Sequence, residues 1–132
     1  MIHLTRELAG KIIEHCEREL PNEACGILAG NRGEVKKIYE MTNTGKSPIR
    51  FFMDAQEQFK VMKDMRNSNL EMIGIYHSHV ASRAYPSAHD IEMAFYPDVS
   101  YVIVSLSDKD KPEIKSFRIA EGTITEEEIK IE

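Results

Sequence analysis

The chain has 132 residues, of which 42% are hydrophobic and 30% charged, with a formal net charge of −5. This length suits one domain over 1–132, and the balance supports a folded core, which excludes a disordered protein. No apolar run reaches the roughly 20 residues that cross a bilayer, and no signal-peptide core is present, so we expect a cytoplasmic protein without a membrane partner. Without a basic stripe, nucleic acid is excluded as the expected partner, and two cysteines are too few for a disulfide framework.

The N-terminal part of the chain predicts a helix followed by a hairpin. Apolar side chains recur at three- and four-residue steps from Thr5 to Leu20, and Pro21 ends this pattern. EACGILAG (23–30) is a short strand of small apolar residues, and the turn NRG leads into a second strand, EVKKIYEM (34–41). A loop of turn-forming residues follows.

A brief strand and a second helix are predicted next. IRFFMD (49–54) has the apolar and aromatic residues of a strand, and Asp54 is placed to cap the helix DAQEQFKVMKDMRNS. Within that helix we expect the buried face to consist of Phe59, Met62 and Met65.

The remaining residues predict three further strands and a short helix. EMIGIYHSHV (71–80) is apolar and rich in strand formers, which favours a central strand, and SAHDIEMAF (87–95) predicts the helix. VSYVIVSLS (99–107) and EIKSFRIAEG (113–122) are expected to pair as a hairpin, and the charged tail (123–132) is compatible with an edge strand. This order of elements predicts an α/β (α+β) sandwich, with a mixed, mainly antiparallel sheet flanked by helices.

Two histidines lie near the end of the predicted central strand. Residues i and i+2 of a strand share a face, so His77 and His79 project together and are able to share one metal ion. Asp90 offers an oxygen ligand, and two histidines with a carboxylate leave one position of a tetrahedral zinc site open for water. A simpler interpretation needs no metal: polar residues are common at strand ends, and Ser87 with Asp90 fits a relative of the capping box. The two interpretations are compatible.

Glu23 is the candidate proton carrier, because a zinc hydrolase needs one that is not itself a metal ligand. A carboxylate that enters a strand of small apolar residues is costly unless it is exposed or partnered. A solvated residue at a strand start is the alternative. Cys25 shares the strand face of Glu23, and we expect it to be a small core residue. We expect His89 to be exposed on a first helical turn, without a role in the site.

These segments together resemble the JAMM (MPN-plus) metalloprotease family. The resemblance covers Pro21 to Leu106 and includes PNEACGIL, GIYHSH, PSAHD and YPDVSYVIVSLS in family order. It implies a single MPN-like (cytidine-deaminase-like) domain. The loop after Asp90 is short, without the insertion by which eukaryotic deubiquitinases of the family grip ubiquitin, which implies the compact bacterial and archaeal branch.

The resemblance also implies a role for each site residue. His77, His79 and Asp90 would hold one Zn²⁺ per chain, with a water in the fourth position as the nucleophile. Glu23 would take the proton of that water and later pass it to the leaving amine, acting as general base and then as acid. Ser87 would donate to the oxyanion of the tetrahedral intermediate. The serine between the two histidines points to the other strand face, where packing is the expected role.

The implied activity is that of a zinc-dependent peptidase or isopeptidase. It would hydrolyse the amide bond after the C-terminal Gly-Gly of a ubiquitin-like or sulfur-carrier protein. Three alternatives stay open: a non-catalytic scaffold of the same fold, a zinc deaminase, and a zinc peptidase acting on free peptides. The deaminase is disfavoured because the P-C-x-x-C segment is missing. The sequence leaves the oligomeric state open, with a homodimer as one option.

Overall fold

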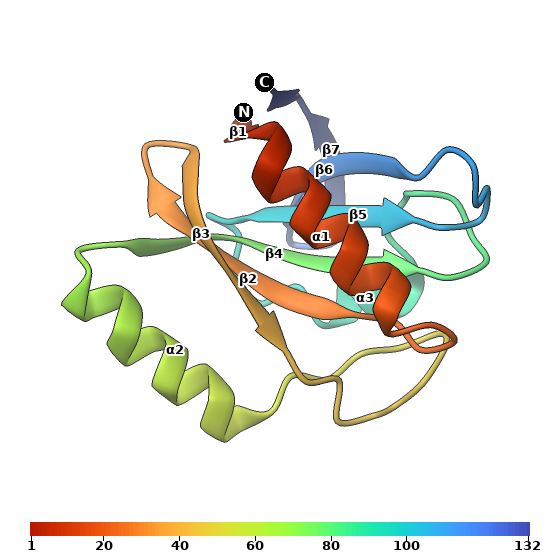
Figure 1. Ribbon diagram of the computed structural model, residues 1–132, viewed down its shortest axis with the longest axis horizontal. Coiled ribbons are helices and arrows are strands. Elements are labelled where there is room, and N and C mark those ends of the chain that lie inside the picture. The colour runs from red at the N-terminus through yellow and green to blue at the C-terminus, as the bar shows by residue number, and fades with distance from the viewer.

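Eight strands form one mixed sheet in the computed structural model, which describes residues 1–132 (Figure 1). In chain order the strands are β1 (Ile2–Leu4), β2 (Cys25–Asn31), β3 (Glu34–Met41), β4 (Glu71–His79), β5 (Ser100–Ser105), β6 (Glu113–Ala120), β7 (Thr123–Glu127) and β8 (Ile129–Ile131). Across the sheet their order is β7-β6-β5-β4-β2-β3-β1-β8. Four neighbouring pairs are antiparallel and three are parallel, which confirms the predicted mixed, mainly antiparallel α+β fold.

Three helices begin where the sequence places capping residues. They are α1 (Arg6–Arg18), α2 (Ala55–Asn67) and α3 (Ala88–Glu92). Before each helix, a side-chain oxygen of Thr5, Asp54 or Ser87 accepts a hydrogen bond from the backbone N–H three positions later. The first N–H groups of a helix lack partners within it, so these caps fix the start of each helix. None of the three helices is long and apolar enough to cross a membrane.

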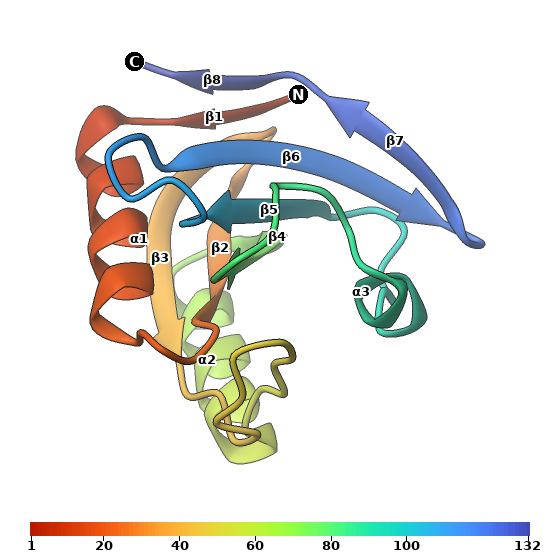
Figure 2. The ribbon, with the colours of Figure 1, turned by 90° about the vertical axis from the view of Figure 1, so that its right-hand side faces the viewer.

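The helices cover opposite faces of the sheet (Figure 2). Ile12 and Cys16 of α1 pack with apolar residues of β2, β4 and β5 on one face, and Met65 of α2 packs on the other. Side chains alternate along a strand, so β4 directs His77 and His79 to the face that carries α2. The predicted central position of β4 is confirmed, because it lies between β2 and β5.

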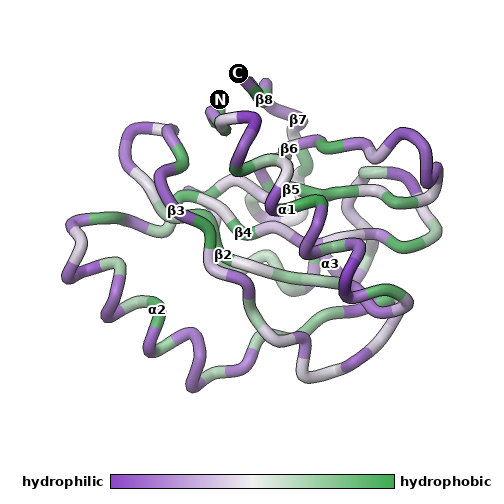
Figure 3. The backbone as a smooth tube through the Cα atoms, in the orientation of Figure 1, coloured by the Kyte–Doolittle hydropathy of each residue, from purple (hydrophilic) through white to green (hydrophobic).

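The predicted buried face of α2 is correct only at Met65. This residue is 4% exposed, whereas Phe59 is 65% exposed and Met62 is 37% exposed. In Figure 3 α2 is mainly hydrophilic, and in Figure 1 it lies along the margin of the sheet. Helical spacing shows which residues share an apolar stripe, but it does not show how far the sheet extends beneath that stripe. The sheet covers Met65 and leaves Phe59 and Met62 open to solvent.

Two further expectations are corrected at the loops and termini. Residues 49–54 form no strand, and only an isolated bridge joins Asn43 to Met53. The side chain of Asn43 instead hydrogen-bonds the carbonyl of Arg50 and the N–H of Phe52, which are therefore not free to pair in a sheet. The N-terminal residues form β1, a strand that the sequence did not indicate. The tail supplies both edge strands, β7 and β8, and β8 pairs in parallel with β1, so the two chain ends lie at opposite ends of this strand pair (Figure 2).

Candidate active site

Three of the predicted site residues converge at the end of β4. The Nε2 atoms of His77 and His79 lie 3.2 Å apart, and each lies close to the same oxygen of Asp90, at 3.1 and 3.0 Å. All three side chains are buried, with at most 8% of any of these residues exposed. Residues from β4 and α3 therefore place three ligand atoms around one point, within 4.8 Å of one another.

This cluster fits a tetrahedral metal ion. Ligand atoms bound to zinc at about 2.0–2.1 Å would lie roughly 3.3 Å from one another, which agrees with the observed separations. The Nδ1 atom of His79 lies 2.8 Å from the carbonyl oxygen of Arg83. A proton on Nδ1 leaves Nε2 as a lone-pair donor, the arrangement that outer-sphere partners impose on metal-binding histidines. The donor set of two imidazoles and one carboxylate suits zinc.

Asp90 and His79 each favour the charged form of the other. Burial opposes ionisation of the Asp90 carboxyl, but hydrogen bonds from His77 and His79 outweigh it and lower its pKa. Burial likewise disfavours the His79 cation, but the hydrogen bond with Asp90 and the contact with Arg83 leave the pKa of His79 raised. A carboxylate that stays ionised beside two imidazoles is suited to hold a cation.

The capping interpretation of Ser87 and Asp90 is confirmed, and it contributes to the site geometry. Ser87 Oγ accepts from Asp90 N–H at 3.1 Å, and Asp90 Oδ2 accepts from Ser87 N–H at 2.9 Å. This is the same Asp90 oxygen that faces both histidines. The capping box therefore fixes that oxygen against β4. Ser87 Oγ accepts in the cap, so its hydroxyl proton stays available to a ligand in the cleft.

Glu23 lies two residues before the start of β2, on the same face as the histidines. The register pairs Cys25 with His77, so Glu23 faces His79 across the two strands. The residue is 4% exposed, and its Oε1 atom is buried without a hydrogen-bond partner. Burial raises the pKa of this carboxyl to about 8. The alternative of a solvated residue at the strand start is therefore wrong, and a buried carboxyl group with an elevated pKa is typical of functional sites.

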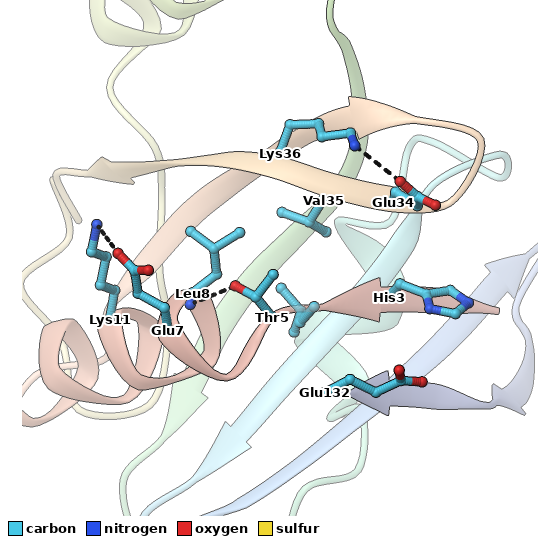
Figure 4. Close-up of a pocket in the computed structure, with 10 residues that line it drawn as sticks. His3, Thr5, Glu7, Leu8, Lys11, Glu34, Val35, Lys36 and Glu132 are labelled. Carbon is cyan, nitrogen blue, oxygen red and sulfur yellow. Dashed lines mark hydrogen bonds and ion pairs between the residues drawn. The ribbon is translucent and has the colours of Figure 1, made fainter.

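A cleft of 310 Å³ gives access to this cluster. Its lining residues are Pro48 and Ile49, the segment from Val80 to Ser82, and Glu23, His79 and Ser87. A wider cleft of 520 Å³ beside β1 and α1 contrasts with it. There the acidic side chains pair with lysines in solvent, as in Glu34 with Lys36 (Figure 4). Of these two clefts, only the one beside Glu23 contains a buried polar group without a partner.

Comparison with known proteins identifies the family of the chain. The family described as prokaryotic homologs of the JAB domain matches residues 5–120. The chain belongs to this family. The compact prokaryotic branch predicted from the sequence is thereby confirmed, and so is a hydrolase of the JAMM type.

Individual known proteins are similar to this chain over most of its length. The CysO-cysteine peptidase of Mycobacterium tuberculosis is 39% identical over 127 residues, which cover 95% of this chain and 87% of that protein. The desampylase of Pyrococcus furiosus is 37% identical over 112 residues, or 83% of this chain and 76% of that protein. The solution structure of DSY2949 from Desulfitobacterium hafniense is 43% identical, with a TM-score of 0.92 over 100% of this chain and 93% of that one.

Two other sequence expectations have mixed outcomes in this JAB-family chain. Cys25 is fully buried among apolar residues, as expected of a core residue, and burial raises its pKa to about 12. His89 is not exposed: its Nε2 atom is buried without a partner, and its ring lies edge-on to Phe52 at 5.4 Å. The sequence pattern gave no sign that Phe52, in the loop before α2, would pack against His89 of α3.

Two contacts to the candidate metal ligands were missed from the sequence. The ring of Phe51 stacks on His77 with centroids 4.6 Å apart, which limits rotation of the imidazole. The partner of His79 is a main-chain carbonyl, that of Arg83, which carries no side-chain signature. The aromatic pair in IRFFMD was the available signal for Phe51, but it was interpreted as strand propensity.

Proposed function

We propose that this chain is a single-domain, zinc-dependent peptidase or isopeptidase that hydrolyses the amide bond after the C-terminal Gly-Gly of a ubiquitin-like or sulfur-carrier protein. One observation carries the proposal: three candidate metal-ligand atoms gather beside a cleft that is lined by a buried carboxyl without a partner and by the Ser87 hydroxyl. The names of the relatives support the substrate class, because they describe a CysO-cysteine peptidase and a desampylase.

The candidate ligands and the proton carrier have separate tasks in this reaction. His77, His79 and Asp90 would hold the metal. Bound Zn²⁺ supplies a Lewis acid for the scissile carbonyl and lowers the pKa of a water molecule. Glu23 would take a proton from the attacking water and deliver it to the leaving amine, a task for which its buried carboxyl in the cleft beside His79 is placed.

Ser87 would stabilise the negative charge that develops on the carbonyl oxygen. Its Oγ atom is held by the N–H of Asp90, so the hydroxyl proton is aimed by a rigid helix start rather than by a mobile loop. A preorganised donor of this kind lowers the barrier without reorganisation during the reaction.

The cleft also supports the preference for glycine. It is lined by the 48–49 segment, the 80–82 segment, Glu23 and His79. An extended tail without side chains would enter a cleft of this size with little steric cost, whereas a branched residue beside the scissile bond would crowd the residues that line it. Gly-Gly tails meet this requirement.

The test uses the zinc-loaded protein and a carrier protein whose Gly-Gly tail is joined to a cysteine, a lysine side chain or a short peptide. Product masses identify which amide is cleaved. We expect cleavage directly after the second glycine, loss of cleavage with a chelator, and its return on adding Zn²⁺. A Gly→Leu change at the terminal position should abolish turnover. Cleavage that persists with chelator, or that tolerates leucine, would contradict the proposal.

A further inference from the structure

The Oε1 atom of Glu23 is buried without a hydrogen-bond partner, so no hydrogen bond to this atom sets the direction of the carboxylate. Its position depends instead on where its backbone is anchored. The N–H of Glu23 donates to the carbonyl of Ser47 at 2.8 Å, and the following peptide unit is held from both of its sides. Two buried side chains provide those contacts, and neither has a place in the chemistry described above.

Asn43 holds the carbonyl side of the Glu23–Ala24 peptide. Its Nδ2 donates to the Glu23 carbonyl at 3.0 Å and to the Arg50 carbonyl at 2.9 Å. Its Oδ1 accepts from the N–H of Gly45 at 3.0 Å and of Phe52 at 3.1 Å. An asparagine amide has two donor hydrogens and two acceptor lone pairs, so all four positions are used. Asn43 is 5% exposed.

Ser78 holds the amide side of the same peptide. Its hydroxyl oxygen accepts from the N–H of Ala24 at 2.8 Å, and Ser78 is fully buried. The serine lies between His77 and His79 on β4 and points to the opposite face. The strand that presents the candidate metal ligands on one face thus fixes, from its other face, the backbone from which Glu23 extends.

We propose that Asn43 and Ser78 are positioning residues that set the direction of the Glu23 carboxylate relative to the candidate metal ligands. This inference rests on the function proposed above. Each residue satisfies one polar group of the same buried peptide, so removing either one leaves that group without a partner and frees the peptide to rotate. A displacement of about 1 Å at a reacting group costs on the order of 10²-fold in rate.

The test compares Ser78→Ala with Ser116→Ala. Both serines are fully buried on strands and both hydroxyls make a hydrogen bond, but Ser116 bonds to Glu127 on β7, away from the cleft. With zinc-loaded protein and the Gly-Gly substrate, we expect Ser78→Ala to lower kcat about 10- to 100-fold, with KM and zinc content unchanged. Ser116→Ala should leave kcat within about twofold while lowering Tm.

Two further variants separate positioning from folding. Ser78→Thr keeps the hydroxyl and should retain most of kcat. Asn43→Asp keeps the shape of the side chain but loses both donor hydrogens, and it should lower kcat to the same extent as Ser78→Ala at full zinc content. The inference is overturned if Ser78→Ala and Asn43→Asp match Ser116→Ala in kcat, or if their losses arise only from KM or zinc content.

Glu23→Gln, measured in parallel, separates this inference from the proposed function. An inactive Glu23→Gln with fully active Ser78→Ala and Asn43→Asp would refute the positioning roles and leave the proposed chemistry intact. An active Glu23→Gln would refute the role of Glu23 as proton carrier, and with it the basis of the inference.

Discussion

Glu23 and Glu127 are both shielded from solvent, but their surroundings are opposite. Glu23 lies at the cleft beside the candidate metal ligands, and its Oε1 atom has no partner. Glu127 lies on β7, near the N-terminus and β6, with 10% of its side chain exposed. There it accepts hydrogen bonds from the Ser116 hydroxyl at 2.7 Å, from Arg118 Nε at 3.2 Å and from the amino group of Met1 at 3.2 Å.

The two environments shift the carboxyl pKa values in opposite directions. Burial raises the pKa of Glu23 to about 8. Burial also acts to raise that of Glu127, but hydrogen bonds from Ser100, Ser116, Arg118 and the amino terminus outweigh it and lower the pKa to about 2. A shielded carboxylate with a full set of partners contributes to stability. One without partners costs stability, which is why it indicates a functional site.

The largest expected effect that follows from this contrast is on activity. Glu23→Gln preserves size and removes proton transfer, so kcat should fall by about 10²- to 10⁴-fold while the zinc content stays at one per chain. Steady-state rates and metal analysis on the same preparation measure both. Glu127→Gln is the matched control, and we expect its kcat to equal that of the wild type. A similar loss of kcat in both variants would remove the distinction between the two carboxylates.

The second prediction concerns the stability of the metal-free protein as pH changes. Because the pKa of Glu23 is raised, the folded state binds more protons than the unfolded state between about pH 4.5 and 8, so this carboxyl lowers stability progressively as pH rises. Glu23→Gln lacks this effect. Its advantage in free energy of unfolding should grow from near zero at pH 4.5 to on the order of 2 kcal/mol at pH 8, with solvent screening included.

Urea denaturation of chelated wild-type and Glu23→Gln proteins at pH 5, 7 and 8.5 measures this difference. A gap between the two proteins that does not change with pH would mean that Glu23 titrates normally in the folded state.

A smaller effect of opposite sign is expected at Glu127. Its depressed pKa means that its stabilisation is present above about pH 4.5 and is lost as pH falls toward 2. Glu127→Gln should therefore lower the free energy of unfolding by on the order of 1 kcal/mol at pH 7, since solvent near this group screens part of the interaction. Repeating the denaturation at pH 3 should show a reduced gap. An equal gap at both values would contradict the assignment.

The smallest effect is expected in the wide cleft beside β1. The ion pair between Glu34 and Lys36 is formed at 2.9 Å between side chains that are more than half exposed. Exposed pairs of this kind contribute little to stability. Glu34→Gln should leave both Tm and kcat at the wild-type values. A clear loss of activity would show that the wide cleft contributes to function.

Local signals in the sequence were sufficient to place the candidate metal ligands and the helix caps. His77 and His79 share a face because strands alternate, and Ser87 with Asp90 forms a cap whose residues are three positions apart, so no distant contact is needed to place either pair. Glu23 was found through its spacing to those segments, although its burial was not foreseen.

The loop between β3 and α2 could not be predicted in the same way. Asn43 organises this loop through hydrogen bonds to backbone groups up to 20 residues away in the sequence. Phe51, which lies in the loop, packs on His77 of β4. Such contacts have no period in the sequence, and the apolar run of this loop was taken for a strand. The exposure of Phe59 was missed for a related reason, since periodicity shows which residues share a face but not what covers that face.

The contrast between the two glutamates can be measured directly by carboxyl ¹³C NMR on the metal-free protein, with both side chains followed through one pH titration. We predict that the Glu23 carboxyl titrates near pH 8, and that the Glu127 carboxyl titrates near pH 2 or remains ionised until the protein unfolds in acid. Titration of both groups near the ordinary value of about 4.3 would contradict the account.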